Sequence, residues 1–293
     1  MSKKNVLAVI GGSGLYEIEG LTNVSELRVD TPFGAPSDAI VKGELGDTTF
    51  LFLPRHGRGH RVAPHAINYR ANICALKMSG ATHLLSVSAV GSMKEEIAPG
   101  DLVIVDQFID LTKRRVSSFF DEGLVGHVGF GDPVCDKLGS ALATAAKGAV
   151  RSESSKSRVH EGGTYVCIEG PQFSSRAESL VYRSWGVSVI GMTAMPEAKL
   201  AREAELPYAT LALSTDYDCW HASEEDVSVE AVVATLQKNI GLAKRTLALL
   251  AGALPDPATS RATGALKNAV MTAPSAVSAE AKKKLAWLVG SVQ

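Results

Sequence analysis

Short runs of β-branched and other apolar residues recur along the chain, and helical patterns separate many of them. The runs are "NVLAVI", "TTFLFL", "HLLSVSAV", "LVIVDQ", "TYVCI", "VSVIGM" and "YATLAL". Several are apolar throughout, which is typical of strands that are covered on both faces. Strands that alternate with helices favour an α/β fold, in which helices flank a central parallel or mixed sheet.

The helical patterns have recognisable ends. "INYRANICALKMSG" ends at Gly80 and "SSRAESLVYRSWG" at Gly186, while "PEAKLAREAEL" opens with Pro196 at a plausible first helical position. "SVEAVVATLQKNIGLAKRTLALL" predicts one long amphipathic helix. A chain of 293 residues is within the reach of one large α/β domain. We expect that domain over residues 1–253, a loose Ala-, Pro-, Ser- and Thr-rich connection over 254–278, and a short C-terminal helix of the same domain over 279–293.

Charge and cysteine usage exclude several classes of protein. Thirty basic and thirty-one acidic residues give a formal net charge of −1, which leaves no electrostatic footprint for nucleic acid or an anionic membrane. The four cysteines are scattered without a C-x-x-C pair, which fits reduced thiols better than a disulfide framework or a zinc site. No apolar run approaches the roughly 18 residues of a membrane span. We therefore expect a cytoplasmic protein without nucleic-acid or membrane partners.

Two loops that follow predicted strands carry groups suited to an anion. In "VLAVIGGSG" the chain passes from a strand into a glycine turn, where backbone N–H groups and the Ser13 hydroxyl suit an anion. A plain tight turn fits equally well, because the dinucleotide fingerprint fails at Glu17 and the P-loop lysine is missing. "FLFLPRHGRGH" places Arg55 and His56 directly after a strand. Arginine offers a planar fork of donors for phosphate, although a solvated basic loop is the ordinary interpretation.

Three further runs end in small, hydroxyl-bearing or acidic residues. They supply Ser88, Ala89 and Gly91, then Met192 and Thr193, then Asp216 and Asp218. In open α/β sheets ligands bind outside the carboxyl ends of the strands, so these loops are expected to converge on a small oxyanion such as phosphate. Asp216 and Asp218 would share a face of an extended segment. They would also suit a turn cap or a divalent metal.

The motifs "IGGSGLY", "PRHGRGH", "VSAVGS", "EEIAPGDLVIVDQFIDLT", "IEGPQFSSRAES", "IGMTAMPEAKLARE" and "STDYDCW" resemble those of the methylthioadenosine phosphorylases in the trimeric purine nucleoside phosphorylase family. The resemblance runs from about residue 6 to residue 250. It implies a nucleoside phosphorylase-like catalytic domain over residues 1–253. It also implies cleavage of 5′-methylthioadenosine by phosphate to adenine and 5-methylthioribose 1-phosphate, as in purine and methionine salvage, with no metal and no organic cofactor.

The same resemblance implies roles for individual residues. Those for phosphate are Ser13, Arg55, His56, Ser88 and Thr193. Those for the nucleoside are Ala89, Gly91, Phe173 near the purine, Met192 at the ribose, and Val227, Val229, Val232 and Val233 around the methylthio group. His127 would reach into a neighbouring subunit's site, which implies a homotrimer or a dimer of trimers. From the residues alone, Phe173 and the valines would count as core and His127 as an ordinary surface histidine.

The expected reaction explains why two acids would stand together. Phosphorolysis of an N-glycosidic bond builds positive charge on the sugar, and the departing purine needs a proton or a hydrogen bond. Asp216 and Asp218 are the expected catalytic pair, because a nearby acid and a partly dry aromatic setting raise the pKa of a carboxyl group. The alternatives are a 6-oxopurine nucleoside phosphorylase, a metal-dependent glycosyltransferase and a non-catalytic nucleotide-binding module.

Overall fold

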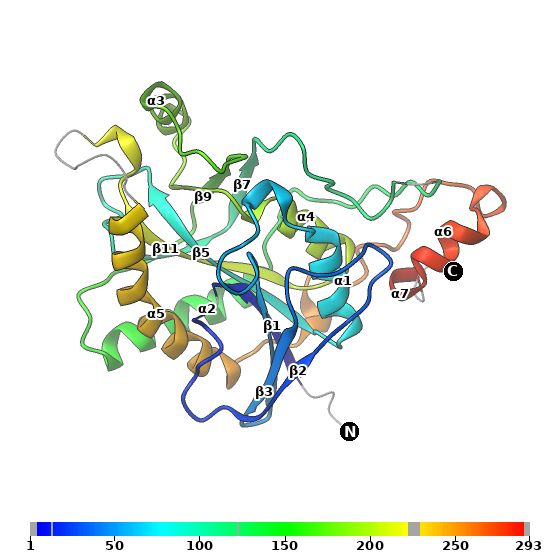
Figure 1. Cartoon of the computed structure of the whole chain (residues 1–293), viewed down its shortest axis with the longest axis horizontal. Helices are drawn as coiled ribbons and strands as arrows, with labels where there is room; N and C mark the ends of the chain where they lie inside the picture. Colours follow the sequence, from blue (N-terminus) through cyan, green and yellow to red (C-terminus); the bar gives the residue numbers. More distant parts are fainter. Residues whose placement is uncertain (1–4, 13, 122, 222–228, 290–293) are drawn as a thin grey trace.

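The computed structural model describes residues 5–12, 14–121, 123–221 and 229–289, in which helices surround one mixed sheet (Figure 1). The strands are β1 (Asn5–Gly11), β2 (Thr22–Leu27), β3 (Ile40–Leu45), β4 (Thr48–Pro54), β5 (His83–Ser92), β6 (Leu102–Val105), β7 (Gln107–Asp110), β8 (Val159–Glu161), β9 (Thr164–Cys167), β10 (Val189–Gly191) and β11 (Tyr208–Asp216). The helices are α1 (Tyr69–Met78), α2 (Asp136–Ser152), α3 (Arg176–Ser184), α4 (Ala194–Glu203), α5 (Val229–Ala251), α6 (Ala279–Lys284) and α7 (Ala286–Val289). Short 3-10 turns are η1 (Pro64–Ala66), η2 (Asp218–Trp220), η3 (Pro257–Thr259) and η4 (Pro274–Ala276).

Strand β5 is the junction of the sheet. One path through the sheet runs β2-β3-β4-β1-β5-β10-β9-β7, while β11 pairs with both β5 and β6, and β6 pairs with β8. Strand β5 lies parallel to β1 and β11 and antiparallel to β10. The predicted α/β fold with a mixed central sheet is therefore confirmed. Because β5 and β11 are parallel, their carboxyl ends meet at one edge of the sheet.

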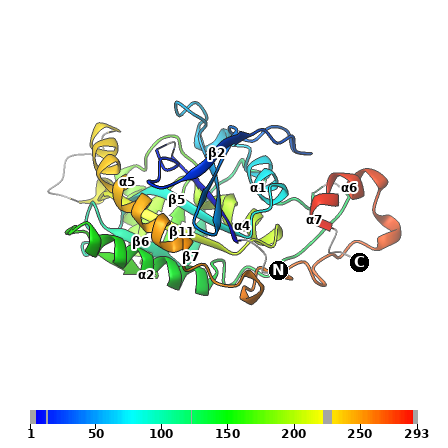
Figure 2. The ribbon, with the colours of Figure 1, turned by 90° about the horizontal axis from the view of Figure 1, so that it is seen from below.

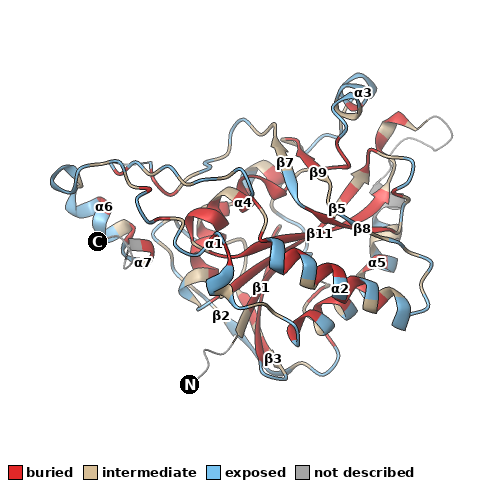
Figure 3. Cartoon of the chain, turned by 180° about the vertical axis from the view of Figure 1, so that it is seen from behind, coloured by how far each residue is buried: buried red, intermediate tan, exposed pale blue. Residues whose placement is uncertain are grey.

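Alternating residues of the central strands face two separate cores. On β1, Leu7 and Val9 join the core formed with α2 and α5, whereas Ala8 and Ile10 join the core formed with α1 and α4. Figure 2 shows the two helical layers on opposite faces of the sheet, and Figure 3 shows the buried strands between more exposed helices. These strands therefore appear in the sequence as continuous apolar runs because both of their faces are buried.

The seven predicted strand runs all form strands, and the predicted helix ends at Gly80 and Gly186 are confirmed. Helices α1 and α3 stop shortly before these two glycines, which have φ values of 90° and 75°. Such positive values suit glycine, which has no Cβ to clash. The predicted opening of a helix at Pro196 is displaced, because Met195 and Pro196 have non-helical backbone angles and the regular turns of α4 follow them.

The segment after residue 253 packs against the body at several points. Ala262, Leu266 and Ala269 are buried, and Val270 forms a bridge with Gly126. The predicted C-terminal helix consists of two short helices, α6 and α7, up to residue 289, with Leu285 between them. Both lie at the opposite end of the molecule from α3 (Figure 1). In the described parts of the chain, none of the helices combines the length and apolar character needed to cross a bilayer.

Candidate active site

Asp216 and Asp218 lie close together because the chain turns between them. Strand β11 ends at Asp216, Tyr217 leaves the extended conformation, and Asp218 has a φ of 52° at the start of η2. The prediction that both acids leave one extended segment is therefore wrong. Instead, the Asp218 backbone N–H donates to Oδ1 of Asp216 at 2.8 Å, which is the geometry of an Asx turn. Asp216 thus caps the turn and is held by it.

Ser179 on α3 fixes the second acid. Its hydroxyl donates to Oδ2 of Asp218 at 2.5 Å, and both side chains are buried. Helix α3 starts with a capping box between Ser175 and Glu178, which fixes its first turn and so the direction of Ser179. Sequence reasoning missed this serine, because nothing in "SSRAES" distinguishes it from its neighbours.

Burial is the main cause of the perturbed acidity at this pair. Burial raises the pKa of Asp216, hydrogen bonds from the Thr215 hydroxyl and the Asp218 N–H oppose the rise, and the charge of Asp218 adds a smaller increase. Burial also raises the pKa of Asp218, and the Ser179 hydroxyl opposes it. Crowding by the second acid, which the sequence suggested as the cause, ranks behind loss of water.

Gly91 allows β5 to approach the acids. A Cβ at this position would lie 2.9 Å from Oδ1 of Asp216 and 3.0 Å from Cγ2 of Ile190. Carbon atoms do not approach an oxygen or a methyl group that closely without a shift. Gly91 is therefore required for contact between β5 and the acidic turn, and Ala89, two residues earlier, is partly exposed on the same strand.

The hydroxyls of Ser88 and Thr193 meet although 105 residues separate them in the chain. Val189 pairs with Ser92 and Ile190 with Gly91, and continuing this antiparallel register brings Thr193 to Ser88. Their oxygen atoms lie 3.2 Å apart, and both residues are buried. The Thr193 hydroxyl does not cap α4. Burial raises the pKa of Tyr165, which the sequence did not single out, to about 12, and hydrogen bonds between its hydroxyl and Ser88 and Thr193 oppose this rise.

Arg55 is buried, so its ordinary interpretation as part of a solvated basic loop is wrong. Its Nε lies 2.9 Å from Oε2 of Glu197, and Nη2 donates to the Ser86 hydroxyl at 2.7 Å. Further donors reach the carbonyl oxygens of Val87 and Ile10, each at 3.0 Å. Because a guanidinium has five N–H donors, these contacts leave only one Nη1 hydrogen without an acceptor in the described chain. No local pattern in the sequence marks Glu197 as the partner of Arg55.

His56 is neutral at neutral pH. Its Nδ1 lies 2.8 Å from the carbonyl oxygen of Val62, and its ring stacks on His60 at 4.2 Å. Burial lowers the pKa of His56 to about 4, with the charge of Arg55 acting in the same direction and the Val62 carbonyl opposing it. Since a carbonyl oxygen only accepts, Nδ1 carries the hydrogen and Nε2 is left as an acceptor. Such a ring suits the protonated oxygen of a phosphate.

The residues expected at the nucleoside are less enclosed. Phe173 is 48% exposed in the loop after β9, and Val233 on α5 is 44% exposed. Met192 is half-buried, and its sulfur lies so close to Gly170 that a Cβ there would be 2.5 Å away. His127 is exposed in the segment between β7 and α2, and its backbone N–H donates to the carbonyl of Ala269.

Several expected residues lie outside the described parts of the chain. These are Ser13, Val227 and the side chains of Val229 and Val232. The glycine turn and the methylthio pocket are therefore represented only by their described neighbours.

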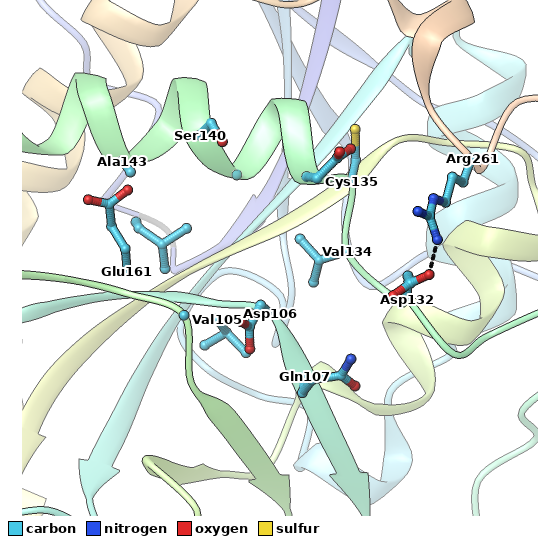
Figure 4. Close-up of a pocket in the computed structure, with 14 residues that line it drawn as sticks. Val105, Asp106, Gln107, Asp132, Val134, Cys135, Ser140, Ala143, Glu161 and Arg261 are labelled. Carbon is cyan, nitrogen blue, oxygen red and sulfur yellow. Dashed lines mark hydrogen bonds and ion pairs between the residues drawn. The ribbon is translucent and has the colours of Figure 1, made fainter.

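One cavity of the structure lies away from the candidate active site. It has a volume of about 330 Å³, and residues of α2 and of the segments around β6 and β8, such as Asp106, Ser140 and Glu161, line it (Figure 4). A second cavity of about 680 Å³ lies between α5 and the loop before β6. Neither is lined by an expected phosphate or nucleoside residue. In the described residues no group of three or more His, Cys, Asp or Glu side chains is arranged to hold a metal ion.

The chain belongs to the phosphorylase superfamily, whose family model matches residues 6–251. The S-methyl-5′-thioadenosine phosphorylase of Geobacter sulfurreducens is 52% identical over 289 residues, which cover 98% of this chain and 99% of the relative. The enzyme of the same name from Synechocystis sp. is 51% identical, with 97% of this chain and 86% of the relative covered.

Two solved structures have the same fold. The structure of a methylthioadenosine phosphorylase from an antarctic soil metagenomic library has a TM-score of 0.91 and 48% identity, and the match covers 98% of this chain and 99% of that one. Methylthioadenosine phosphorylase from Schistosoma mansoni in complex with adenine has a TM-score of 0.78 and 36% identity, and the match covers 86% of this chain and 92% of that one. Both matches therefore cover most of this chain.

Proposed function

We propose that the protein catalyses the phosphorolysis of 5′-methylthioadenosine, giving adenine and 5-methylthioribose 1-phosphate, with inorganic phosphate as co-substrate and without a metal or organic cofactor. The observation that carries the proposal is the spacing along β5. Ser88 meets Thr193, and Gly91 meets Asp216. Three residues of strand span about 10 Å, which leaves room for a ribose between a phosphate at the hydroxyls and a purine at the acid. The names of the relatives support the same reaction.

Phosphate binding is assigned to buried hydroxyls and a neutral histidine. Ser88 and Thr193 donate to phosphate oxygens, Ser13 adds a third hydroxyl, and Nε2 of His56 accepts from the protonated oxygen. Arg55 has one remaining Nη1 hydrogen for the anion, since its other donors are engaged by Glu197, the Ser86 hydroxyl and main-chain carbonyls. Its main contribution is to hold the ends of β1 and β4 against the middle of β5 beside the site.

The acid pair acts on the purine. A phosphate oxygen attacks C1′ as the C1′–N9 bond breaks, and the bonding electrons move onto the base. Asp216, whose pKa is raised by burial, is assigned as the proton donor to purine N7, and this proton relieves the negative charge on the leaving group. Asp218, oriented by Ser179, accepts from the 6-amino group. Phe173 lies along the purine, Ala89 and Gly91 along the nucleoside, and Met192 against the ribose.

The methylthio group and the neighbouring subunit complete the site. Val229 and Val233 at the start of α5 provide an apolar wall for the methylthio group, and His127 reaches the site of the adjacent subunit. The protein is then a homotrimer or a dimer of trimers. The exposure of Val233 and His127 in the single chain supports this arrangement. A catalytically competent monomer, seen by sedimentation at assay concentration, would contradict it.

The test compares three nucleosides at saturating phosphate. An apolar 5′ pocket cannot satisfy a buried hydroxyl, so methylthioadenosine should exceed adenosine in kcat/KM. Two carboxyl groups prefer the 6-amino group, so methylthioadenosine should also exceed methylthioinosine. A higher kcat/KM for methylthioinosine would replace the proposal with a 6-oxopurine phosphorylase, and no release of any base would reject phosphorolysis altogether.

A further inference from the structure

One buried arginine joins the loops that surround the candidate site. The side chain of Arg115 is 1% exposed and lies just after β7. Its Nη1 donates to the carbonyl oxygens of Met192 at 2.7 Å and Met195 at 2.6 Å. Its Nη2 donates to the carbonyl oxygen of Glu169 at 2.6 Å and lies 3.4 Å from that of Ile168. A single guanidinium therefore holds the main chain of two separate loops.

The carboxylate of Glu169 joins the same hydrogen-bond network. Oε1 of Glu169 accepts from Nε of Arg115 at 2.8 Å, and Oε2 accepts from the backbone N–H groups of Lys113 at 2.7 Å and Arg114 at 3.0 Å. The Tyr69 hydroxyl on α1 accepts from Nη1 of Arg115 at 2.9 Å. Residues 113–115, 168–169 and 192–195 are thus tied to one another and to the body of the protein.

These three loops follow β7, β9 and β10, which are neighbours in the sheet. They lead to Met192, Thr193 and Phe173, which we assigned to the ribose, the phosphate and the purine. We propose that Arg115 is a positioning residue for phosphorolysis, which sets the distance between Thr193 and the nucleoside without contacting either substrate. This inference rests on the proposed function of the site.

The chemistry of arginine fits this task and that of lysine does not. A guanidinium is planar and presents five donors in fixed directions, whereas an ammonium group is a compact point charge with three donors. Lysine at position 115 keeps the charge beside Glu169 but cannot span the carbonyls of both loops. The substitution Arg115→Lys therefore loosens the loops while it preserves the ion pair.

The experiment measures Tm and steady-state kinetics of Arg115→Lys with methylthioadenosine and phosphate. We expect kcat/KM for phosphate to fall by roughly 10- to 100-fold, because small misplacements of reacting groups cost that much. In Arg115→Ala, free guanidinium at millimolar concentration should restore part of the activity, and ammonium at the same concentration should not. A role in stability alone would not produce this selectivity.

Arg202→Lys is the matched control. Arg202 is also buried and donates to main-chain carbonyls, those of Gly129 and Asp132, which lie outside the three loops. We expect it to lower Tm but to leave the KM for phosphate within about twofold. Equal kinetic losses in both lysine variants, or wild-type kinetics in Arg115→Lys, would overturn the inference. If neither Arg115 variant folds, Glu169→Gln should raise the KM for phosphate, and no change there would overturn it as well. A wild-type protein without phosphorolysis would instead reject the proposed function.

Discussion

Replacement of Arg55 by methionine tests whether this residue mainly supports the fold of the site. Glu197 is 1% exposed, and in wild type its carboxylate is paired with Nε of Arg55 at 2.9 Å. In Arg55→Met the carboxylate stays buried, with the Tyr208 hydroxyl at 3.3 Å as its remaining side-chain partner in the described chain. Removal of one partner from a buried ion pair costs about 3–5 kcal/mol. We expect a loss of this size in the free energy of unfolding.

The assay is urea unfolding followed by tryptophan fluorescence, since Trp220 lies in a buried cluster beside the site. Protomer concentration is held fixed, because assembly shifts apparent stability. The double variant Arg55→Met/Glu197→Gln removes the unpaired charge, so it should be more stable than Arg55→Met by at least about 1 kcal/mol. A mainly structural role for Arg55 would be contradicted by a free energy of unfolding of Arg55→Met within about 1 kcal/mol of wild type. A further loss of stability in the double variant would contradict it as well.

Two other substitutions give distinct results. Asp216→Asn keeps the size of the side chain but removes the transferable proton. The kcat/KM for methylthioadenosine should therefore fall by about 10²- to 10⁴-fold, and that for methylthioinosine should fall less. Equal losses for the two substrates would show that Asp216 is not the acid. Glu203 accepts hydrogen bonds from the Phe119 N–H and the Ser118 hydroxyl, and burial raises its pKa from 4.5 to about 7. The protonated Glu203 side chain therefore stabilises the folded protein below pH 4.5, and this contribution is lost as the pH rises through 7. Glutamine stays neutral, so the free energy of unfolding of Glu203→Gln relative to wild type should increase by about 3 kcal/mol between pH 4.5 and 7.5. A difference that does not change with pH would contradict this.

Much of the fold follows from the sequence because its central strands are apolar on both faces. Two helical layers cover strands β1, β4, β5 and β11. Their residues are therefore apolar on both faces, and each strand appears in the sequence as a continuous apolar run. Strand β2 is largely exposed and β8 is only three residues long, so neither produces an apolar run. Helix α2 packs through alanines and glycine as well as leucines, and this helix was not predicted.

Some residues of the candidate site could be predicted from the sequence, and others could not. The hydroxyls of Ser88 and Thr193 could be singled out because Ser88 lies in the second half of a recognisable strand and Thr193 comes shortly after another. The partners Ser179, Glu197 and Arg115 were not, because each acts across the fold on a residue far away in the sequence and carries no local pattern. The burial of Arg55 illustrates the limit: the sequence shows a charged loop, and only the tertiary structure reveals the carboxylate and carbonyls that surround it.

We propose that phosphate, and not water, takes the sugar from the purine. The most direct measurement follows adenine release and phosphate consumption together, with methylthioadenosine as substrate and EDTA present. We expect one phosphate to be esterified for each adenine released, and no release when phosphate is omitted. Adenine released at the same rate without phosphate would identify a hydrolase, and activity that disappears with EDTA would identify a metal-dependent transferase; either result contradicts the proposed function.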